Sequence, residues 1–286
     1  MDLQEEISIL VNDLKEGRYS LLKEFTELLE NTPLIRKQVD CKVVFVGDLH
    51  GDLYSLLRLI DLYEKGDSLI VFLGDYVDRG YYQLETLMGV LLLKKLLGDR
   101  ILLLRGNHED PMMNYNYGFL MDIRHKLGLK GLRIYQTYIL DIYIRLPVAA
   151  LINTGGRKIF AVHGGIPIEV PSLNEISQIR QRVDVLEDPT LLQLLWNDPL
   201  EDVEDYAPNI RGEGIFYYGR KIVEKFMVKN DVDLIVRAHE PVSSGARSMF
   251  NGRLYTVFTC RYYGISPSVL EVEPHRIHVK KLGSVV

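Results

Sequence analysis

Five short apolar segments of the chain are each followed by side chains that bind metal ions or move protons. The corners after these segments read GDLHG at 47–51, GDYVDRG at 74–80, GNHE at 106–109, HGG at 163–165 and AHE at 238–240. They hold four of the seven histidines, namely His50, His108, His163 and His239. Aspartate, histidine and asparagine without thiolates suit a cation such as Mn²⁺, Fe or Zn²⁺ rather than an iron-sulfur cluster. The corners therefore predict a metal site.

The elements that must position these corners follow from the apolar pattern. Residues 42–46, 68–73 and 100–104 are apolar after their first residue and are interpreted as buried strands, and the stretches from 53 to 63 and from 83 to 97 between them have helical spacing. Alternating buried strands and helices predict a largely parallel sheet covered by helices. Ligands bind beyond the carboxyl ends of such strands, so the corners should meet at one site.

The rest of the chain is more mixed. Residues 2–30 predict helices, and helical spacing returns at 190–196 and 220–229. Ser172 and Glu175 predict a capping box at the start of a helix, and Asn251 with Gly252 predicts a tight hairpin. Strands are expected at 138–145, 158–162, 233–237 and 254–259.

Length and composition narrow the class of protein. A chain of 286 residues fits a single catalytic domain spanning 1–286, with an N-terminal helical segment at 1–32. The net charge of −5 argues against a nucleic-acid partner, and two cysteines are too few for a disulfide framework. No apolar run is long enough to span a membrane, and the amino terminus does not resemble a targeting peptide. We expect a cytoplasmic protein without membrane contact.

The ordered series of corners resembles the phosphoprotein phosphatase family, which contains protein phosphatases 1 and 2A and calcineurin. The resemblance includes LWNDP at 195–199, RGEG at 211–214 and the segment 258–263, and covers roughly residues 40–272. It implies an α/β fold with a metallophosphoesterase-like central β-sandwich of mixed sheets flanked by helices. It also implies a serine/threonine protein phosphatase in which a hydroxide bridging two metals attacks the phosphomonoester. A minimal catalytic unit of archaeal type is expected.

By the same resemblance, two divalent metal ions would share one carboxylate. Asp48, His50 and Asp75 would hold the first ion, whereas Asp75, Asn107, His163 and His239 would hold the second. Mn²⁺ is the expected metal, with Fe or Zn²⁺ as alternatives. Such a pair of cations lowers the pKa of a shared water and clamps the phosphoryl oxygens during attack.

The resemblance also assigns the residues around the substrate. Arg79 and Arg211, with Asn107 and Tyr263, would bind the phosphate, because arginine forms fork-like bonds with its oxygens. His108 would be the general acid that protonates the leaving alkoxide, and Asp78 would orient it. Asp198 and Tyr206 are further expected at the mouth of the site. His125, His275 and His278 are assigned to the surface, and Trp196 to core packing.

Two segments depart from the family pattern. The acidic loop expected after Tyr263 is shortened, and residues 110–115 differ from the usual continuation of the GNHE corner. Phosphorylated proteins are the expected substrates, and regulatory subunits are expected partners. Two alternatives are a dinucleoside polyphosphate hydrolase of the same superfamily and an inactive scaffold that uses the fold only for binding.

Overall fold

A computed structural model describes residues 2–283 of the chain, and its core is built on two β-sheets. In the five-stranded sheet the order is β14-β13-β2-β3-β4. The neighbouring strands β2 (Val43–Val46), β3 (Leu69–Phe72) and β4 (Ile101–Leu103) are parallel, as the alternation of strands and helices predicts. The strands β13 (Ser268–Val272) and β14 (Ile277–Lys281) add an antiparallel edge, so the sheet is mixed.

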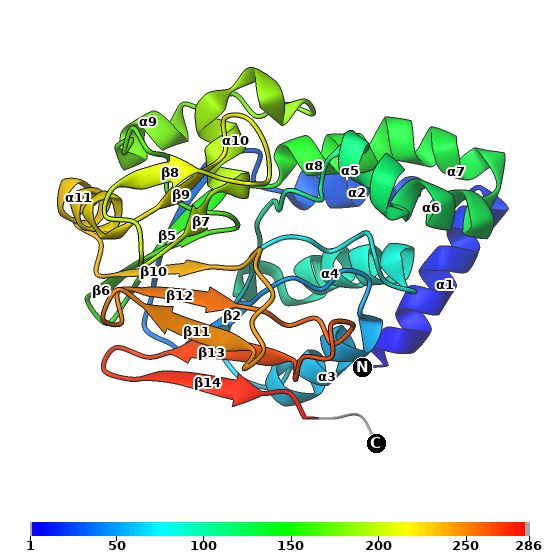
Figure 1. Cartoon of the computed structure of the whole chain (residues 1–286). Helices are drawn as coiled ribbons and strands as arrows, with labels where there is room; N and C mark the ends of the chain where they lie inside the picture. Colours follow the sequence, from blue (N-terminus) through cyan, green and yellow to red (C-terminus); the bar gives the residue numbers. More distant parts are fainter. Residues whose placement is uncertain (1, 284–286) are drawn as a thin grey trace.

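The second sheet has six strands in the order β1-β5-β6-β10-β12-β11. Their bounds are β1 (Leu34–Val39), β5 (Ala149–Thr154), β6 (Arg157–Val162), β10 (Leu234–Arg237), β11 (Ala246–Met249) and β12 (Leu254–Val257). A third, small sheet joins β7 (Asp198–Pro199), β9 (Phe216–Tyr218) and β8 (Tyr206–Pro208). In Figure 1, β10, β12 and β11 of the six-stranded sheet lie one below the other, with β13 and β14 of the five-stranded sheet, in orange-red and red, beneath them.

The two large sheets bury one apolar layer between them. In β2, Val43 and Phe45 face this layer, where they join Val71 of β3 and residues such as Ile152 and Val236 of the other sheet. Successive residues of a strand point to opposite faces, so Val44 and Val46 belong instead to the core on the outer face. The expected fold, a sandwich of mixed sheets flanked by helices, is confirmed.

Helices cover both outer faces of the sandwich (Figure 1). The helices packed around the five-stranded sheet are α1 (Leu3–Glu16), α2 (Ser20–Leu28), α3 (Leu53–Tyr63), α4 (Gln83–Leu97), α5 (Pro111–Tyr117), α6 (Phe119–Leu127), α7 (Leu129–Ile134) and α8 (Leu140–Arg145). The six-stranded sheet is covered by α9 (Leu173–Ser177), α10 (Pro189–Trp196) and α11 (Arg220–Asn230). Single 3₁₀ turns lie at Gly98–Arg100 and Val185–Glu187. None of the helices within residues 2–283 combines the length and apolar character that a bilayer crossing requires.

The strand predicted at 138–145 is wrong, because this segment is helical. A π-helical segment, Tyr135–Ile139, continues from α7 into α8. The buried residues of this region are Tyr135, Ile139, Ile142 and Tyr143, which follow the spacing i, i+4, i+7 and i+8 of one helix face. The aromatic and β-branched composition of 138–145 favours a strand locally, but the longer periodicity that starts at Tyr135 decides the structure.

Two local signals in the sequence are confirmed. Ser172 and Glu175 form a capping box at the start of α9. Asn251 and Gly252 both have positive φ, at 57° and 83°, in the turn between β11 and β12.

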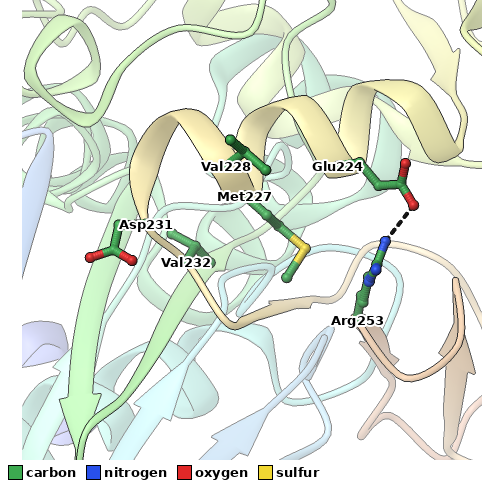
Figure 2. Close-up of a pocket in the computed structure, with 6 residues that line it drawn as sticks. All are labelled: Glu224, Met227, Val228, Asp231, Val232 and Arg253. Atoms are coloured by element: carbon green, nitrogen blue, oxygen red, sulfur yellow. Dashed lines mark hydrogen bonds and ion pairs between the residues drawn. The ribbon is translucent and has the colours of Figure 1, made fainter.

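Just after this turn, Arg253 forms an ion pair with Glu224 of α11, which Figure 2 shows beside the side chains of a surface pocket. The ion pair ties the β11–β12 hairpin to the helix that covers it.

Candidate functional site

The predicted site residues converge on one cavity of about 510 Å³. Its lining includes Asp48, His50, Asp75, Arg79, Asn107, His108, Arg211, His239 and Tyr263. His163 is completely buried beside Asp75, 3.4 Å from its carboxylate. Most of these residues follow strands of the two large sheets, and Arg211 comes from the segment between β8 and β9 of the small sheet, so the fold brings together groups that are far apart in the chain.

The backbone segments after the strands lie so close together that a side chain at some of their glycine positions would clash. A Cβ at Gly47 would lie 2.1 Å from Val257 O, and a Cβ at Gly74 would lie 2.3 Å from Gly106 N. Gly74 also has φ of +108°, a backbone conformation that side chains rarely adopt. Glycine is therefore required where the β2 and β3 corners meet their neighbours.

Five non-glycine residues of the site have a left-handed backbone conformation. Positive φ values occur at His50 (48°), Asp75 (57°), Asp78 (67°), Arg79 (68°) and His239 (68°). Such conformations are uncommon outside glycine and persist where the surroundings enforce them, often at functional sites. Four of the five, His50, Asp75, Arg79 and His239, line the cavity, and the fifth, Asp78, lies behind it against His108.

A buried carboxylate that the sequence reasoning did not assign holds two corners together. Glu109 accepts hydrogen bonds from the backbone N–H groups of Asp75 (2.8 Å), Tyr76 (2.9 Å) and Gly106 (2.8 Å). It is fully excluded from solvent. Because these donors belong to the corners after β3 and β4, Glu109 fixes the distance between Asp75 and Asn107. Its place in the GNHE corner is the signal that could have revealed it.

The first group of candidate metal ligands surrounds the imidazole of His50. Its Nε2 lies 3.5 Å from Asp48 Oδ2 and 3.6 Å from Asp75 Oδ2. Its Nδ1 lies 2.9 Å from Val77 O. A carbonyl oxygen only accepts, so Nδ1 must carry the hydrogen, and in the neutral ring Nε2 is an acceptor facing both carboxylates.

The second group surrounds His163 and shares Asp75 with the first. His163 Nε2 lies 3.4 Å from Asp75 Oδ2, 2.9 Å from Asn107 Oδ1 and 3.1 Å from His239 Nδ1. Its Nδ1 donates to Leu73 O at 3.0 Å. The ligand atoms of Asp75, His163 and His239 all lie within 4.8 Å of one another. Oδ2 of Asp75 thus faces both groups, while its Oδ1 accepts the His108 N–H at 2.8 Å.

The electrostatics of this arrangement suit a bound cation. Burial lowers the pKa of His163 to about 4, so the ring is neutral and its Nε2 is a free acceptor. Burial, together with the negative charges of Asp48 and Glu109, raises the pKa of Asp75 well above its usual value. The side chains of Asp75, Asn107 and His239 surround His163 Nε2 with atoms that can accept a hydrogen bond or bind a metal. A cation bound between them would interact favourably with all of these atoms. The donor set contains no thiolate and fits Mn²⁺, Fe or Zn²⁺.

Beside these groups, His108 and Asp78 form a buried pair. His108 Nδ1 lies 2.7 Å from Asp78 Oδ2. Asp78 also accepts hydrogen bonds from Asn114 Nδ2 and from the Phe119 N–H, both at 3.0 Å. Burial raises the pKa of Asp78 to about 7 despite these donors. Burial, and next the charge of His50, lower the pKa of His108 well below its usual value.

Arg79 lines the cavity and lies close to two tyrosine rings. Its guanidinium lies 4.8 Å from the ring centre of Tyr117 and 5.9 Å from that of Tyr263. One of its terminal nitrogens, Nη2, is 3.3 Å from His108 Nε2. The stacked guanidinium is therefore held with its polar edge toward His108.

Arg211 also lines the cavity and is anchored by Asp198. Its Nε donates to Asp198 Oδ2 at 2.6 Å, while Arg237 Nη2 donates to Asp198 Oδ1 at 2.9 Å. Asp198 and Arg237 are buried, so one carboxylate links an interior arginine to the arginine at the cavity. Asp198 therefore holds Arg211 in place without lining the cavity itself.

Tyr206 is half exposed, packs on Phe216 and does not line the cavity, so its expected place at the mouth is wrong.

Three further histidines and Trp196 were assigned places outside the site. His125, His275 and His278 are exposed, as predicted. The assignment of Trp196 to core packing is incomplete, because its ring also lines the cavity and meets the His239 ring edge-on at a centroid distance of 5.6 Å. Trp196 directly precedes the NDP residues of the LWNDP segment, which was the available signal for this second role.

Comparisons with known proteins agree with this geometry. A family model described as calcineurin-like phosphoesterase matches residues 41–243. The serine/threonine-protein phosphatase 4 catalytic subunit of Candida glabrata is 38% identical, over 96% of this chain and 88% of the relative. The corresponding subunit of Saccharomyces cerevisiae is 36% identical, over 92% of this chain and 84% of the relative. A solved serine/threonine phosphatase from Saccharomyces cerevisiae, described as similar to human phosphatase PP5, is 27% identical with a TM-score of 0.86, covering 99% of this chain and 96% of that one.

Proposed function

This chain belongs to the serine/threonine protein phosphatases of the calcineurin-like phosphoesterase family, and we propose that its cavity hydrolyses phosphoserine and phosphothreonine in proteins by means of two divalent cations. The observation that carries the proposal is the position of Asp75. Its Oδ2 is within 3.6 Å of His50 Nε2 and within 3.4 Å of His163 Nε2, so one carboxylate oxygen serves both groups of ligand atoms.

The proposed ligands follow these two groups. Asp48, His50 and Asp75 would hold one cation, and Asp75, Asn107, His163 and His239 would hold the other. We propose Mn²⁺ as the metal, with Fe or Zn²⁺ as alternatives that the donor set also accepts. When bound, such a pair supplies an activated water near neutral pH and neutralises charge on the phosphoryl oxygens.

The two arginines would hold the substrate phosphate. Arg79 is confined by Tyr117 and Tyr263, and Arg211 by its bond to Asp198, so both guanidinium groups lose little freedom when a phosphate arrives. Fork-like pairing with the phosphate oxygens fixes the phosphorus for in-line attack. Asn107 and Tyr263 would complete the contacts around the phosphate.

His108 would deliver the proton to the leaving serine or threonine oxygen. Asp78 binds its Nδ1, which leaves Nε2 as the atom that faces Arg79 and the cavity. The pKa of His108 is lowered by burial in the free protein, but a bound phosphate dianion brings negative charge next to the ring and favours its protonated form. Protonation of the leaving group matters because an alkoxide leaves poorly.

Comparison of two substrates tests this assignment against the rival hydrolase. Purified protein with added Mn²⁺ is incubated with a phosphoserine peptide and, separately, with diadenosine tetraphosphate. Faster turnover of the peptide supports the protein phosphatase, whereas a strong preference for the nucleotide would overturn the assignment. Absence of any Mn²⁺-dependent hydrolysis of p-nitrophenyl phosphate would favour the binding scaffold instead.

We propose that residues 1–286 act as one catalytic domain. Regulatory subunits are proposed because the relatives carry the name catalytic subunit. A cytoplasmic location stays a prediction.

A further inference from the structure

The loop after β12 is docked onto the corner that carries His50. The carboxylate of Asp52 accepts two hydrogen bonds from Arg261, one from the backbone N–H (3.0 Å to Oδ2) and one from Nε (3.0 Å to Oδ1). The hydroxyl of the next residue, Tyr262, donates to Gly51 O at 3.1 Å. Three bonds from two consecutive residues therefore hold the loop at residues 51 and 52.

The two partners of this ion pair have different surroundings. Asp52 is fully buried, and it also caps α3 by accepting from the Ser55 N–H (3.2 Å) and the Ser55 hydroxyl (2.6 Å). The side chain of Arg261 is 33% exposed, and its guanidinium lies 4.3 Å from the ring centre of Tyr54. Asp52 is thus fixed by the helix, and Arg261 is the partner that brings the loop to it.

The docked segment leads directly into the wall of the cavity. Tyr263 follows two residues after Arg261, and its ring centre is 5.9 Å from the Arg79 guanidinium and 6.3 Å from the His50 ring. Tyr262 packs edge-on against Tyr81, which lies two residues beyond Arg79, at a centroid distance of 5.4 Å. The same loop therefore touches the corner with His50 and the corner with Arg79.

On the basis of the phosphatase function assigned to the same site, we propose that Asp52 and Arg261 are positioning residues that set the place of Tyr263 against Arg79 and thereby the affinity for phosphorylated peptides. They act through the loop and through Arg79. Tyr263 limits the conformational freedom of the Arg79 guanidinium, which would bind phosphate. If the loop is released, Arg79 must be ordered when the substrate binds, and this loss of entropy weakens binding. Neither residue takes part in bond breaking.

The first test is a kinetic comparison of Arg261→Met with wild type, using a phosphoserine peptide and Mn²⁺. We expect the KM for the peptide to rise about fivefold with kcat changed less than about twofold, because the lost contact affects binding and not the chemical step. Arg58→Met is the matched control. Arg58 and Arg261 line the same small surface cavity, which is separate from the phosphatase site, but Arg58 donates to Leu282 O, outside the loop. A fall in kcat at unchanged KM would overturn the assignment.

A double-mutant cycle tests whether the two residues act together. Asp52→Asn keeps acceptor and donor groups of similar size at the start of α3 while removing the charge that faces Arg261. If the pair acts as one unit, the double variant should raise KM about as much as the stronger single variant. Fully additive effects on KM would show that Asp52 and Arg261 act separately and would overturn the proposal.

Hydrogen exchange of backbone amides gives a readout that does not depend on activity. Residues 258–267 should exchange faster in Arg261→Met and at the wild-type rate in Arg58→Met. If KM rises while exchange of this segment is unchanged, Arg261 contacts the substrate directly and the positioning role is wrong. Failure of wild-type protein to hydrolyse the peptide would refute the proposed function, whereas the exchange result would still report on the docking of the loop.

Discussion

His108 and Asp78, thirty residues apart in the chain, form a buried pair in which Nδ1 and Oδ2 are separated by 2.7 Å. The carboxylate is fixed from two more sides, by Asn114 Nδ2 and the Phe119 N–H. Asn114 is in turn held by the hydroxyl groups of Tyr135 and Tyr143, at 2.9 and 3.0 Å. The helical region α5–α8 therefore supports the candidate general acid from behind.

Replacement of His108 should slow substrates according to their leaving group. We expect His108→Asn to lower kcat on a phosphoserine peptide by about 10²–10⁴-fold, because the alkoxide then leaves without a positioned proton donor. Hydrolysis of p-nitrophenyl phosphate should fall much less, since p-nitrophenolate is a good leaving group. Steady-state kinetics on both substrates provide the measurement.

The matched control for this variant is His125→Asn, on the exposed face of α6 (Phe119–Leu127), which should behave like wild type. Elemental analysis should find the same metal content in His108→Asn as in wild type. Equal losses on both substrates would exclude His108 as the acid.

Replacement of Asp75 should disturb both cations at once. Its Oδ2 faces His50 and His163, so Asp75→Asn removes a charge that the two proposed metal positions share. We expect the purified variant to retain well under two divalent ions per chain by elemental analysis. The control, Asp67→Asn, alters an exposed carboxylate between α3 and β3 and should keep the wild-type content. Full metal content in Asp75→Asn would show that Asp75 does not bridge.

Asp198 should contribute to stability as well as to substrate binding. In Asp198→Ala the fully buried Arg237 loses a carboxylate partner, which we expect to lower the free energy of unfolding by about 3 kcal/mol. Arg211 loses its anchor as well, so the KM for peptide should rise. Urea unfolding measures the first effect, with the exposed Asp202→Ala as control. A loss below about 1 kcal/mol, typical of an exposed pair, would contradict the structural role.

The parts of the site that could be predicted from the sequence are the polar residues that directly follow apolar strands. Parallel strands such as β2, β3 and β4 read as apolar runs, and the polar residues directly after them must meet at one edge. Asp48, Asp75 and Asn107 were found in this way, and the family resemblance supplied their proposed roles.

What escaped prediction depends on contacts between distant segments. The helix at Leu140–Arg145 was mistaken for a strand because its composition favours a strand and its helical spacing is visible only from Tyr135 onward. Arg105 belongs to the RGNHE motif, but the motif does not indicate its distant partners: besides Glu109 O, the fully buried Arg105 donates to the carbonyl oxygens of Arg182 and Val183, more than seventy residues away. Only the folded chain reveals such partners.

The central claim is that two cations share Asp75, and crystallography of the wild-type protein with Mn²⁺ tests it most directly through anomalous scattering. The account predicts two anomalous peaks about 3.5–4 Å apart, one beside Asp48 and His50, the other beside Asn107, His163 and His239, with Asp75 between them. A single peak, or peaks that do not contact Asp75, would contradict it.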